Sequence, residues 1–434
     1  MWSRSIFVAV LCVNAIAFAD GNPGSTAHVV LPAAFRTTSV DEMLNGCGDA
    51  GCADGSGEAA DCDPRSCRWL RFDSDATSVL GDNNRVDKVG NWIFGFKKDW
   101  KVPVSIGGWH WWNIDTAGVG NGGYGAKGFH GTYAYYTIVN PTYELDNGRT
   151  IGANVFFAGR DGQPYRTYYS SKFWFLEGYA SISDPELGTL KSGLVFTKFG
   201  LGNYLGFFGT APYFDGFIQD PDYGFSWEKT SQPKDNVTVD SSLQFFLHDG
   251  QWNGGLLNQN SESVAGIHER NTLVARVAPK ITLGEGETLA FGVSGMVGEI
   301  SSVVPGFAGG TRSVWGTHID YIKGPLNLRG EVLQINGPIV PTQFNSGGPS
   351  NRLLSYSTEA AYTIGPVKYR TMFSQSHADN PNGRQTIWSA GTVVQITPHV
   401  RTFIEYSDWT VDGHATLGSV PVIQGVQAVI HWYY

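Results

Sequence analysis

The chain ends with the stretch Gly425-Val426-Gln427-Ala428-Val429-Ile430-His431-Trp432-Tyr433-Tyr434, whose pattern decides the fold. Every second residue counted back from Tyr434 is apolar or aromatic, whereas Gln427 and His431 fall on the opposite face. This period of two is that of a β-strand with one face suited to hydrocarbon. Terminal aromatic residues are unusual in a soluble domain but typical of a transmembrane β-barrel, which has aromatic girdles at both interfaces. A strand of a soluble sandwich is the alternative at this point.

The start of the chain has the three parts of a secretory signal. Arg4 supplies the charged beginning, an apolar run extends from Ile6 to Phe18, and Ala17-Phe18-Ala19 forms an A-x-A cleavage site. The apolar run is too short for a membrane helix. We therefore expect residues 1–19 to be a signal peptide and the mature protein to begin at Asp20.

The composition favours one large all-β unit. The 434 residues include 56 glycines and 13% aromatic residues, with short strand-like runs and turn signals throughout. After the signal, no stretch approaches the roughly eighteen consecutive apolar residues that a membrane helix requires. The net charge of -9 is mild for this length and the Lys and Arg residues are scattered, so no nucleic-acid partner is indicated.

Residues 20–90 differ from the rest and form an N-terminal extension rich in Gly, Ala and Asp. The extension contains Cys47, Cys52, Cys62 and Cys67 in the pattern C-x4-C-x9-C-x4-C. An even number of cysteines in an exported chain favours disulfides, and four cysteines allow three pairings between which the sequence does not choose. A metal or iron-sulfur site is the alternative, but the spacing is wider than in structural zinc sites and no histidine joins the cluster. We predict disulfides, without a metal or cofactor.

From about Lys101 onward, strand-like runs are joined alternately by tight turns and longer polar loops. The tight turns combine Gly, Pro, Asn or Asp in ways that close a hairpin. They lie at residues 146–148, 184–188, 233–236, 284–287, 323–325, 364–366 and 397–399, and the longer loops include 251–266, 301–310, 337–349 and 376–383. Short turns at one end and long loops at the other, with about sixteen strands, are the asymmetry of an outer-membrane barrel.

The strand-like runs alternate between an apolar face and a polar face that often contains charge. The clearest examples are Leu243, Phe245 and Leu247 against Ser242, Gln244 and Phe246; Trp315, Ile319 and Tyr321 against Gly316, His318 and Asp320; and Tyr369 and Phe373 against Lys368, Arg370 and Ser374. A soluble sandwich produces the same alternation. Its conjunction with the signal, the terminal aromatics and the loop asymmetry favours the membrane barrel. The consecutive apolar residues 173–176 break the alternation and predict a bulge or a covered inner face.

We therefore predict an all-β fold, a transmembrane antiparallel β-barrel of about sixteen strands over residues 91–434. The part from about Lys101 to Tyr434 resembles Gram-negative outer-membrane porins of the sixteen-stranded kind. The resemblance rests on the architecture, on the aromatic last strand, and on Gly178-Tyr179-Ala180-Ser181-Ile182-Ser183 followed by Gly188-Thr189-Leu190-Lys191-Ser192-Gly193, which is similar to the turn joining the family's fourth and fifth strands.

The resemblance implies a location in the bacterial outer membrane, contact with lipid, and a homotrimer. It also implies a water-filled channel for passive diffusion of small hydrophilic solutes or ions, and no enzymatic activity. In such porins the loop after the fifth strand folds inward and narrows the barrel. Residues 201–221 occupy that position and are unusually aromatic for a loop exposed to water. The alternative is that residues 204–208 continue the fifth strand above the membrane.

Opposed rings of charge at a constriction would let polar solutes pass and hold back apolar ones. The acidic candidates, assigned by position only, are Asp215, Asp220 and Asp222 on the loop. The basic candidates, on polar strand faces, are Arg276, Lys280, Arg329, Lys368, Arg370 and Arg401. Each basic residue has a plainer alternative as a member of an ion pair inside the barrel. The net charge favours cations and the basic wall favours anions, so the preference stays open.

Two other function classes also stay open. A barrel-based outer-membrane enzyme requires a Ser/His/Asp or paired-carboxylate site. None of the ten histidines lies in a recognisable nucleophile motif, and His318 with Asp320 is the nearest approach. The other class is a conduit whose N-terminal cysteine segment holds a metal cofactor.

Overall fold

The computed structural model describes residues 104–116, 130–145, 148–161, 173–202, 205, 210, 212, 221–249, 267–303, 308–338, 351–379, 384–397, 399–412 and 422–433. The predicted signal, the 20–90 extension and the four cysteines of that extension lie outside these ranges. Within them, no helix is long and apolar enough to cross a membrane.

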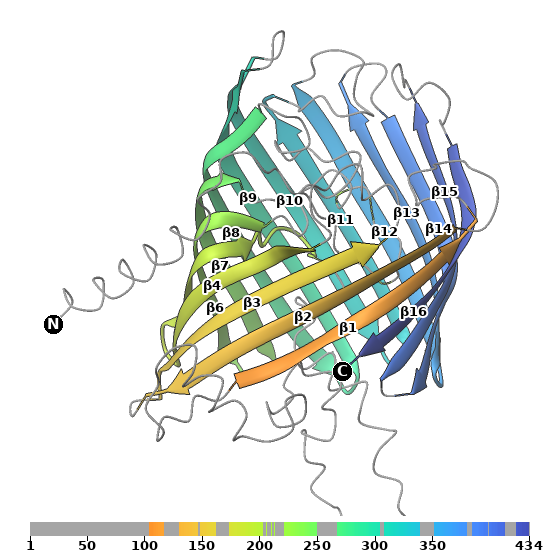
Figure 1. Ribbon diagram of the computed structural model, residues 1–434, viewed down its shortest axis with the longest axis horizontal. Coiled ribbons are helices and arrows are strands. Elements are labelled where there is room, and N and C mark those ends of the chain that lie inside the picture. Colours follow the sequence, from red (N-terminus) through yellow and green to blue (C-terminus); the bar gives the residue numbers. More distant parts are fainter. Residues whose placement is uncertain are drawn as a thin grey trace, which may run out of the picture.

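The described strands form one closed antiparallel barrel (Figure 1). They are β1 (Val104–Asp115), β2 (His130–Glu144), β3 (Thr150–Asp161), β4 (Phe173–Asp184), β5 (Gly188–Phe196), β6 (Pro221–Lys234), β7 (Val237–Asp249), β8 (Ile267–Gly284), β9 (Glu287–Ser302), β10 (Gly310–Lys323), β11 (Leu326–Asn336), β12 (Arg352–Ile364), β13 (Val367–Ala378), β14 (Arg384–Thr397), β15 (Val400–Asp412) and β16 (Val422–Tyr433). Each strand pairs with its neighbour in the chain, and β1 pairs with β16 to close the sheet. The prediction of a sixteen-stranded barrel is confirmed.

The connections alternate in length, as the turn chemistry predicts. Every predicted tight turn lies between an even-numbered strand and the strand that follows it, and every predicted longer loop follows an odd-numbered strand. Gly286, Gly324 and Gly365 hold φ values of 64°, 51° and 53° in three of these turns, a conformation that a residue with a Cβ adopts only with strain. All tight turns therefore lie at one end of the barrel, because the strands run up and down in sequence.

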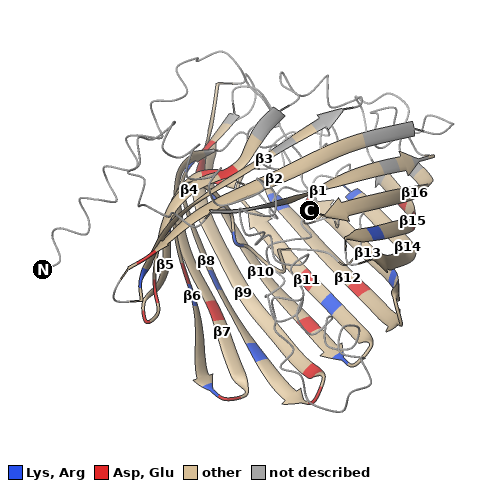
Figure 2. Cartoon of the chain, turned by 60° about the horizontal axis from the view of Figure 1, so that its bottom comes forward, with Lys and Arg blue, Asp and Glu red and all other residues tan. Residues whose placement is uncertain are grey.

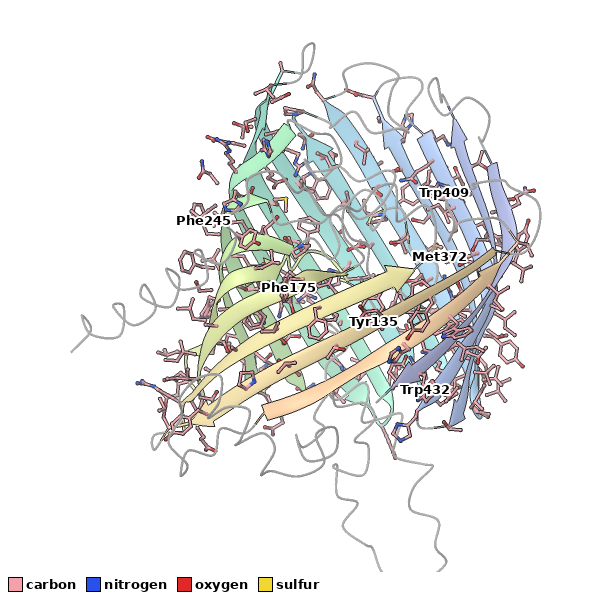
Figure 3. All side chains as sticks on the ribbon, in the orientation of Figure 1. Tyr135, Phe175, Phe245, Met372, Trp409 and Trp432 are labelled. Atoms are coloured by element: carbon pink, nitrogen blue, oxygen red, sulfur yellow. The ribbon has the colours of Figure 1, made fainter. Side chains whose placement is uncertain are left out.

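The barrel is apolar on its outside, and its inside carries polar and charged side chains alongside apolar ones. Trp432 on β16 is 62% exposed, whereas its neighbour His431 is 1% exposed. The same alternation places Phe245 at the outer edge of the barrel and Met372 and Trp409 on its inner wall (Figure 3). The outward residues Leu243, Trp315, Ile319, Tyr369 and Phe373 are all exposed, and the inward Gln244, His318, Arg370 and Ser374 are all buried. The face predicted to contact hydrocarbon is thus the outer one, and no second sheet covers it among the described strands.

The predicted irregularity near residues 173–176 is a β-bulge. Phe156 and Phe157 on β3 pair with Glu177 and Phe175 on β4, so Leu176 is the extra residue. Phe175 is exposed on the outside while Leu176 and Glu177 are both buried. The bulge therefore adds one residue to β4 and lets an apolar run end on an inward carboxylate.

Candidate functional site

Charged side chains and one histidine form a belt on the inner wall of β8 to β15. We call this set the charge belt; it consists of Arg276 (β8), His318 and Asp320 (β10), Arg329 and Glu331 (β11), Glu359 (β12), Arg370 (β13) and Glu405 (β15). Each occupies an inward position of its strand and has an outward apolar neighbour on at least one side. Figure 2 shows that charged residues lie within these strands and not only at their ends. A barrel surrounded by lipid can hold such residues only in its interior.

Two arginines of the charge belt lie between carboxylates. Arg370 donates to Glu405 over 2.6 Å and to Ser389 Oγ over 2.9 Å, and its Nη2 is 3.9 Å from Glu359 Oε2. Arg329 Nη2 lies 3.0 Å from Asp320 Oδ2. Guanidinium groups suit this position because they are always charged and donate in several directions. The wall thus carries charges of alternating sign held at fixed places.

Two glycines make room for contacts that cross a whole strand. Gly391 on β14 pairs with both Arg370 and Glu405, and a Cβ at this position would lie 2.8 Å from Glu405 Cγ. Gly292 on β9 is opposite His318, and a Cβ there would overlap the imidazole ring. With this space open, His318 Nε2 lies 3.5 Å from Arg276 Nη2 across β9. The absence of two side chains allows the charge belt to be continuous.

The segment after β5, described at residues 197–202 and 205 and here called the loop segment, enters the barrel. Its own backbone holds it on the opposite wall. Gly200 N–H donates to Ser294 Oγ (2.9 Å), Leu201 N–H to Glu331 Oε1 (2.7 Å) and Leu205 N–H to Glu359 Oε2 (2.7 Å). Arg276 Nε in turn donates to the Gly200 carbonyl over 2.9 Å. The segment therefore contacts β8, β9, β11 and β12. Leu205 thus lies against the barrel wall, as an inward fold requires and a continued fifth strand does not.

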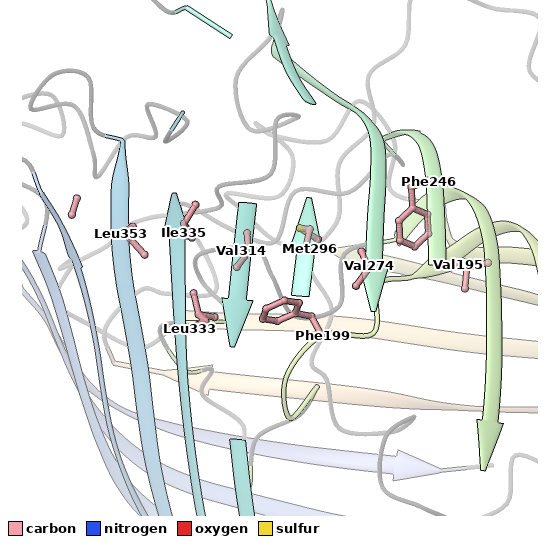
Figure 4. Packing of buried hydrophobic residues seen from close by; sticks show 10 residues of the cluster. Val195, Phe199, Phe246, Val274, Met296, Val314, Leu333, Ile335 and Leu353 are labelled. Carbon is pink, nitrogen blue, oxygen red and sulfur yellow. The ribbon is translucent and has the colours of Figure 1, made fainter. Parts of the chain in front are cut away.

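Phe199 fixes the same segment through apolar contacts. Its ring lies among inward residues of several strands, seen in Figure 4 beside Val314, Met296 and Leu333. The facing position on β10 is Gly316, where a Cβ would come 2.9 Å from the Phe199 ring. The full cluster comprises Val195, Phe199, Phe246, Val274, Met296, Val314, Leu333, Ile335, Leu353 and Ala378. The inner wall thus has an apolar area on which Phe199 packs.

Where this segment begins, two lysines share one carboxylate. Lys191 Nζ on β5 lies 2.7 and 2.8 Å from the two oxygens of Glu228 on β6, and Lys198 Nζ lies 2.7 Å from Glu228 Oε2. Ser226 Oγ donates to Glu228 Oε1 over 3.1 Å. Lys191 Nζ also lies 5.0 Å from the centroid of the Tyr179 ring.

The candidates chosen from the sequence lie in several different surroundings. Asp215 and Asp220 are outside the described residues. Asp222 is buried on β6, where its Oδ2 lies 3.5 Å from Thr197 Oγ1. Arg276, Arg329 and Arg370 belong to the charge belt. Lys280 and Lys368 lie at partly exposed inward positions nearer the tight turns. Arg401 donates to Gln395 Oε1 over 2.9 Å and lies over the Tyr433 ring.

The carboxylates and lysines that position the loop segment were not among these candidates. Glu331, Glu359 and Glu405 each stand at an inward position with an outward apolar residue on at least one side, which is a signal that the sequence contains. Lys191 and Glu228 follow the same alternation on β5 and β6. The sequence does not show which of these inward residues contact the loop segment, because that depends on how the strands pair around the barrel. Among the described residues, no group of three or more His, Cys, Asp or Glu side chains is placed to hold a metal ion.

Solved structures with the same fold are bacterial porins and outer-membrane channels. A Salmonella typhi OmpF in complex with daunomycin has a TM-score of 0.57 at 10% sequence identity, covering 77% of this chain and 98% of its own. The outer membrane channel DcaP of Acinetobacter baumannii has a TM-score of 0.56 at 10% identity, with 78% and 99% covered. An anion-selective porin from Comamonas acidovorans has a TM-score of 0.54 at 14% identity, with 76% and 99% covered. No family model and no curated protein sequence matches the chain.

Proposed function

We propose that the protein is a porin of the bacterial outer membrane, a water-filled channel through which small hydrophilic solutes or ions diffuse passively. The observation that supports this most is the inverted polarity of a closed barrel, with exposed aromatic and aliphatic side chains outside and charged ones inside. A soluble protein gains nothing from this arrangement, because its outer face would meet water and its charges would be desolvated. In lipid both preferences are satisfied.

The segment after β5 is proposed to narrow the channel. Its backbone N–H groups donate to the side chains of Ser294, Glu331 and Glu359, which lie on the wall across the barrel from β5. A segment tied at several points in this way holds a fixed cross-section. A passage bounded by charged and polar side chains favours solutes that keep their water or exchange it for polar contacts.

A channel explains the interior better than an enzyme does. His318 and Asp320, the nearest approach to an acid-base pair, lie on one strand face but have separate partners. His318 Nε2 is next to Arg276, and Asp320 lies against Arg329. Both side chains therefore interact with arginines of the charge belt and not with each other.

We further propose that the protein is a homotrimer, with the outer face of β16, β1 and β2 inside the assembly. His110 on this outer face contacts the hydroxyl of Tyr133, and its ring is 6.3 Å from that of Tyr135 and 6.5 Å from that of Trp432. A polar imidazole facing outward from the barrel is more stable against a second copy than in hydrocarbon. Cross-linking followed by mass measurement in detergent would report three copies, and a monomer under all mild detergents would contradict the assembly.

The channel is tested by reconstitution of the purified protein into planar bilayers. We expect stepwise, ohmic single-channel currents, and uptake of small sugars by vesicles that contain the protein. The control is the same preparation after heat unfolding in detergent. Absence of current at all voltages, or recovery of the native protein from the periplasm without detergent, would contradict the proposal.

A further inference from the structure

Lys191 and Lys198, here called the lysine pair, form a partly exposed cluster of charge inside the barrel near the loop segment. Lys191 and Glu228 are on the inner side, because their neighbours Leu190 and Trp227 are exposed on the other face. Lys198 lies on the same side, because its Nζ contacts Glu228. The Lys191 side chain is 15% exposed and that of Lys198 is 34% exposed. Two ammonium groups balanced by the one carboxylate of Glu228 leave a local excess of one positive charge.

The position of Lys198 is fixed by its backbone and not by Glu228 alone. Its N–H donates to Gln244 Oε1 over 2.7 Å, and Gln244 Nε2 donates to the Phe196 carbonyl over 3.0 Å and to Ser226 Oγ over 3.0 Å. Gln244 is itself buried. The Gln244 side-chain amide therefore holds the backbone on both sides of residue 197, and this places Lys198 next to Glu228. Such a preorganised group binds a ligand with little further loss of freedom.

Three other carboxylates nearby are unavailable to a solute. Glu331 and Glu359 accept backbone N–H groups of the loop segment, and Glu177 accepts from Asn154 Nδ2 and from the Phe196 N–H. All three side chains are buried. A solute that reaches this depth thus meets the two lysines and Glu228, whose side chain is 15% exposed, while these three carboxylates are covered and hydrogen-bonded.

More positive charge lies on the inner wall between this level and the tight turns. Lys280 on β8, Lys368 on β13 and Arg401 on β15 are partly exposed at inward positions. Of the described inward acidic groups nearer the tight turns, Asp240 accepts from Thr230 Oγ1 and Asp320 pairs with Arg329, whereas Glu144 on β2 is exposed. Positive charge thus occurs at several inward positions around the wall and is not confined to the lysine pair.

We propose that the lysine pair is a binding site for small anions that carry a carboxylate or phosphate group, and that it makes the channel anion-preferring. This rests on the proposed channel function and names the class of solute. An anionic oxygen takes hydrogen bonds from both ammonium groups as Glu228 does, and the excess positive charge draws it into the passage. Because Glu228 competes for the same donors, the anion is held weakly enough to leave again.

The test is ion selectivity in planar bilayers under a potassium chloride gradient. We expect the wild-type reversal potential to indicate chloride preference, and the double variant Lys191→Gln/Lys198→Gln to lose that preference by several-fold in the permeability ratio. Glu228→Gln is expected to shift the ratio in the opposite direction, because it leaves both lysines without their carboxylate. Lys234→Gln, which removes one positive charge from the exposed β6–β7 turn, is the control for a single lysine and should leave the ratio unchanged.

Inhibition of the chloride current by inorganic phosphate provides a second measurement, in which both lysines are retained. Phosphate added to one side should reduce the chloride current of the wild type in a saturable way, and more strongly in Glu228→Gln. A conducting wild type that prefers cations, or a permeability ratio that stays the same in the double variant and in Glu228→Gln, would overturn the anion site alone. A wild type that carries no current would overturn the channel function together with it.

Discussion

Leu201 and Glu331, separated by 130 positions in the sequence, are joined by a hydrogen bond of 2.7 Å from the backbone N–H of Leu201 to Glu331 Oε1. The contact crosses the interior of the barrel, from the segment after β5 to the wall at β11. Both partners are buried. A side-chain carboxylate thus does for the loop segment what a neighbouring strand does for the rest of the sheet, by satisfying a backbone donor.

Replacing Glu331 by Ala should loosen the loop segment, whereas Glu331→Gln should not. The Ala variant leaves the Leu201 N–H without its acceptor, which costs about 1–3 kcal/mol for a buried donor, while the Gln side chain retains an acceptor oxygen. We expect Glu331→Ala to give a noisier single-channel current with a larger mean conductance. Equal current noise in the two variants would show that the hydrogen bond does not hold the segment.

Gly200→Ala should destabilise the protein more than Gly365→Ala. The two glycines have similar positive φ values of 58° and 53°, so each substitution carries the same backbone strain of about 1–2 kcal/mol. A Cβ at residue 200 would also overlap the Glu331 carboxylate, whereas one at residue 365 meets open space. Urea unfolding in lipid, followed by tryptophan fluorescence, should give a lower midpoint for Gly200→Ala. Identical midpoints would mean that the segment moves freely away from β11.

Arg370→Met should lower the free energy of unfolding more than Glu405→Gln. Arg370 serves two carboxylates, Glu405 at 2.6 Å and Glu359 at 3.9 Å, so its loss leaves two buried negative charges together. Removing one member of a buried pair typically costs about 3–5 kcal/mol. Glu405→Gln retains Glu359 and a hydrogen-bond acceptor for the guanidinium. The opposite ranking in the same unfolding assay would contradict the role of Arg370 as the shared cation.

Val293→Arg tests the lipid-facing surface. Val293 lies in the middle of β9 and is exposed on the outer face. Arginine on the lipid face is expected to destabilise the folded barrel by about 2–4 kcal/mol near the membrane midplane and by about 0–1 kcal/mol near the interfaces. Ile364→Arg, at the tight-turn end of β12, is the interfacial control. The free energy of folding into vesicles should separate the two variants, and equal values would argue against a lipid surround.

Acid should weaken one contact between turns. Arg149 donates to Asp184 Oδ2 over 2.6 Å at the tight-turn end, and this hydrogen bond, aided by the N–H groups of Glu186 and Leu187, holds the pKa of Asp184 below its ordinary value. A lowered folded-state pKa adds stability above the unfolded-state pKa of about 4, and this contribution is lost as the pH falls through the folded-state value. The urea midpoint of Asp184→Asn should therefore be lower than that of the wild type at neutral pH, and the difference should vanish in acid. A constant difference across that range would exclude the ion pair as its source.

The barrel could be predicted from the sequence because its determinants are local. The period of two in β16 separates Trp432 from His431, and the turn residues at 284–287 and 364–366 place strand ends without reference to the rest of the fold. Even the bulge at Leu176 is visible as a break in alternation. A one-residue slip would reverse every face, so the pattern itself constrains the register.

The interior of the barrel was decided only by the tertiary structure. The alternation marks Glu331, Glu359 and Lys191 as inward, but it does not indicate which of them face the loop segment, because that depends on the closure and stagger of the sheet. The pairing of Arg370 with Glu405 needs β14 between them and Gly391 at the crossing point. The sequence alone therefore determined which side of each strand meets lipid, since side-chain direction is a property of the local backbone. Which charges meet inside depends on distances between strands far apart in the chain, and only the closed barrel sets those distances.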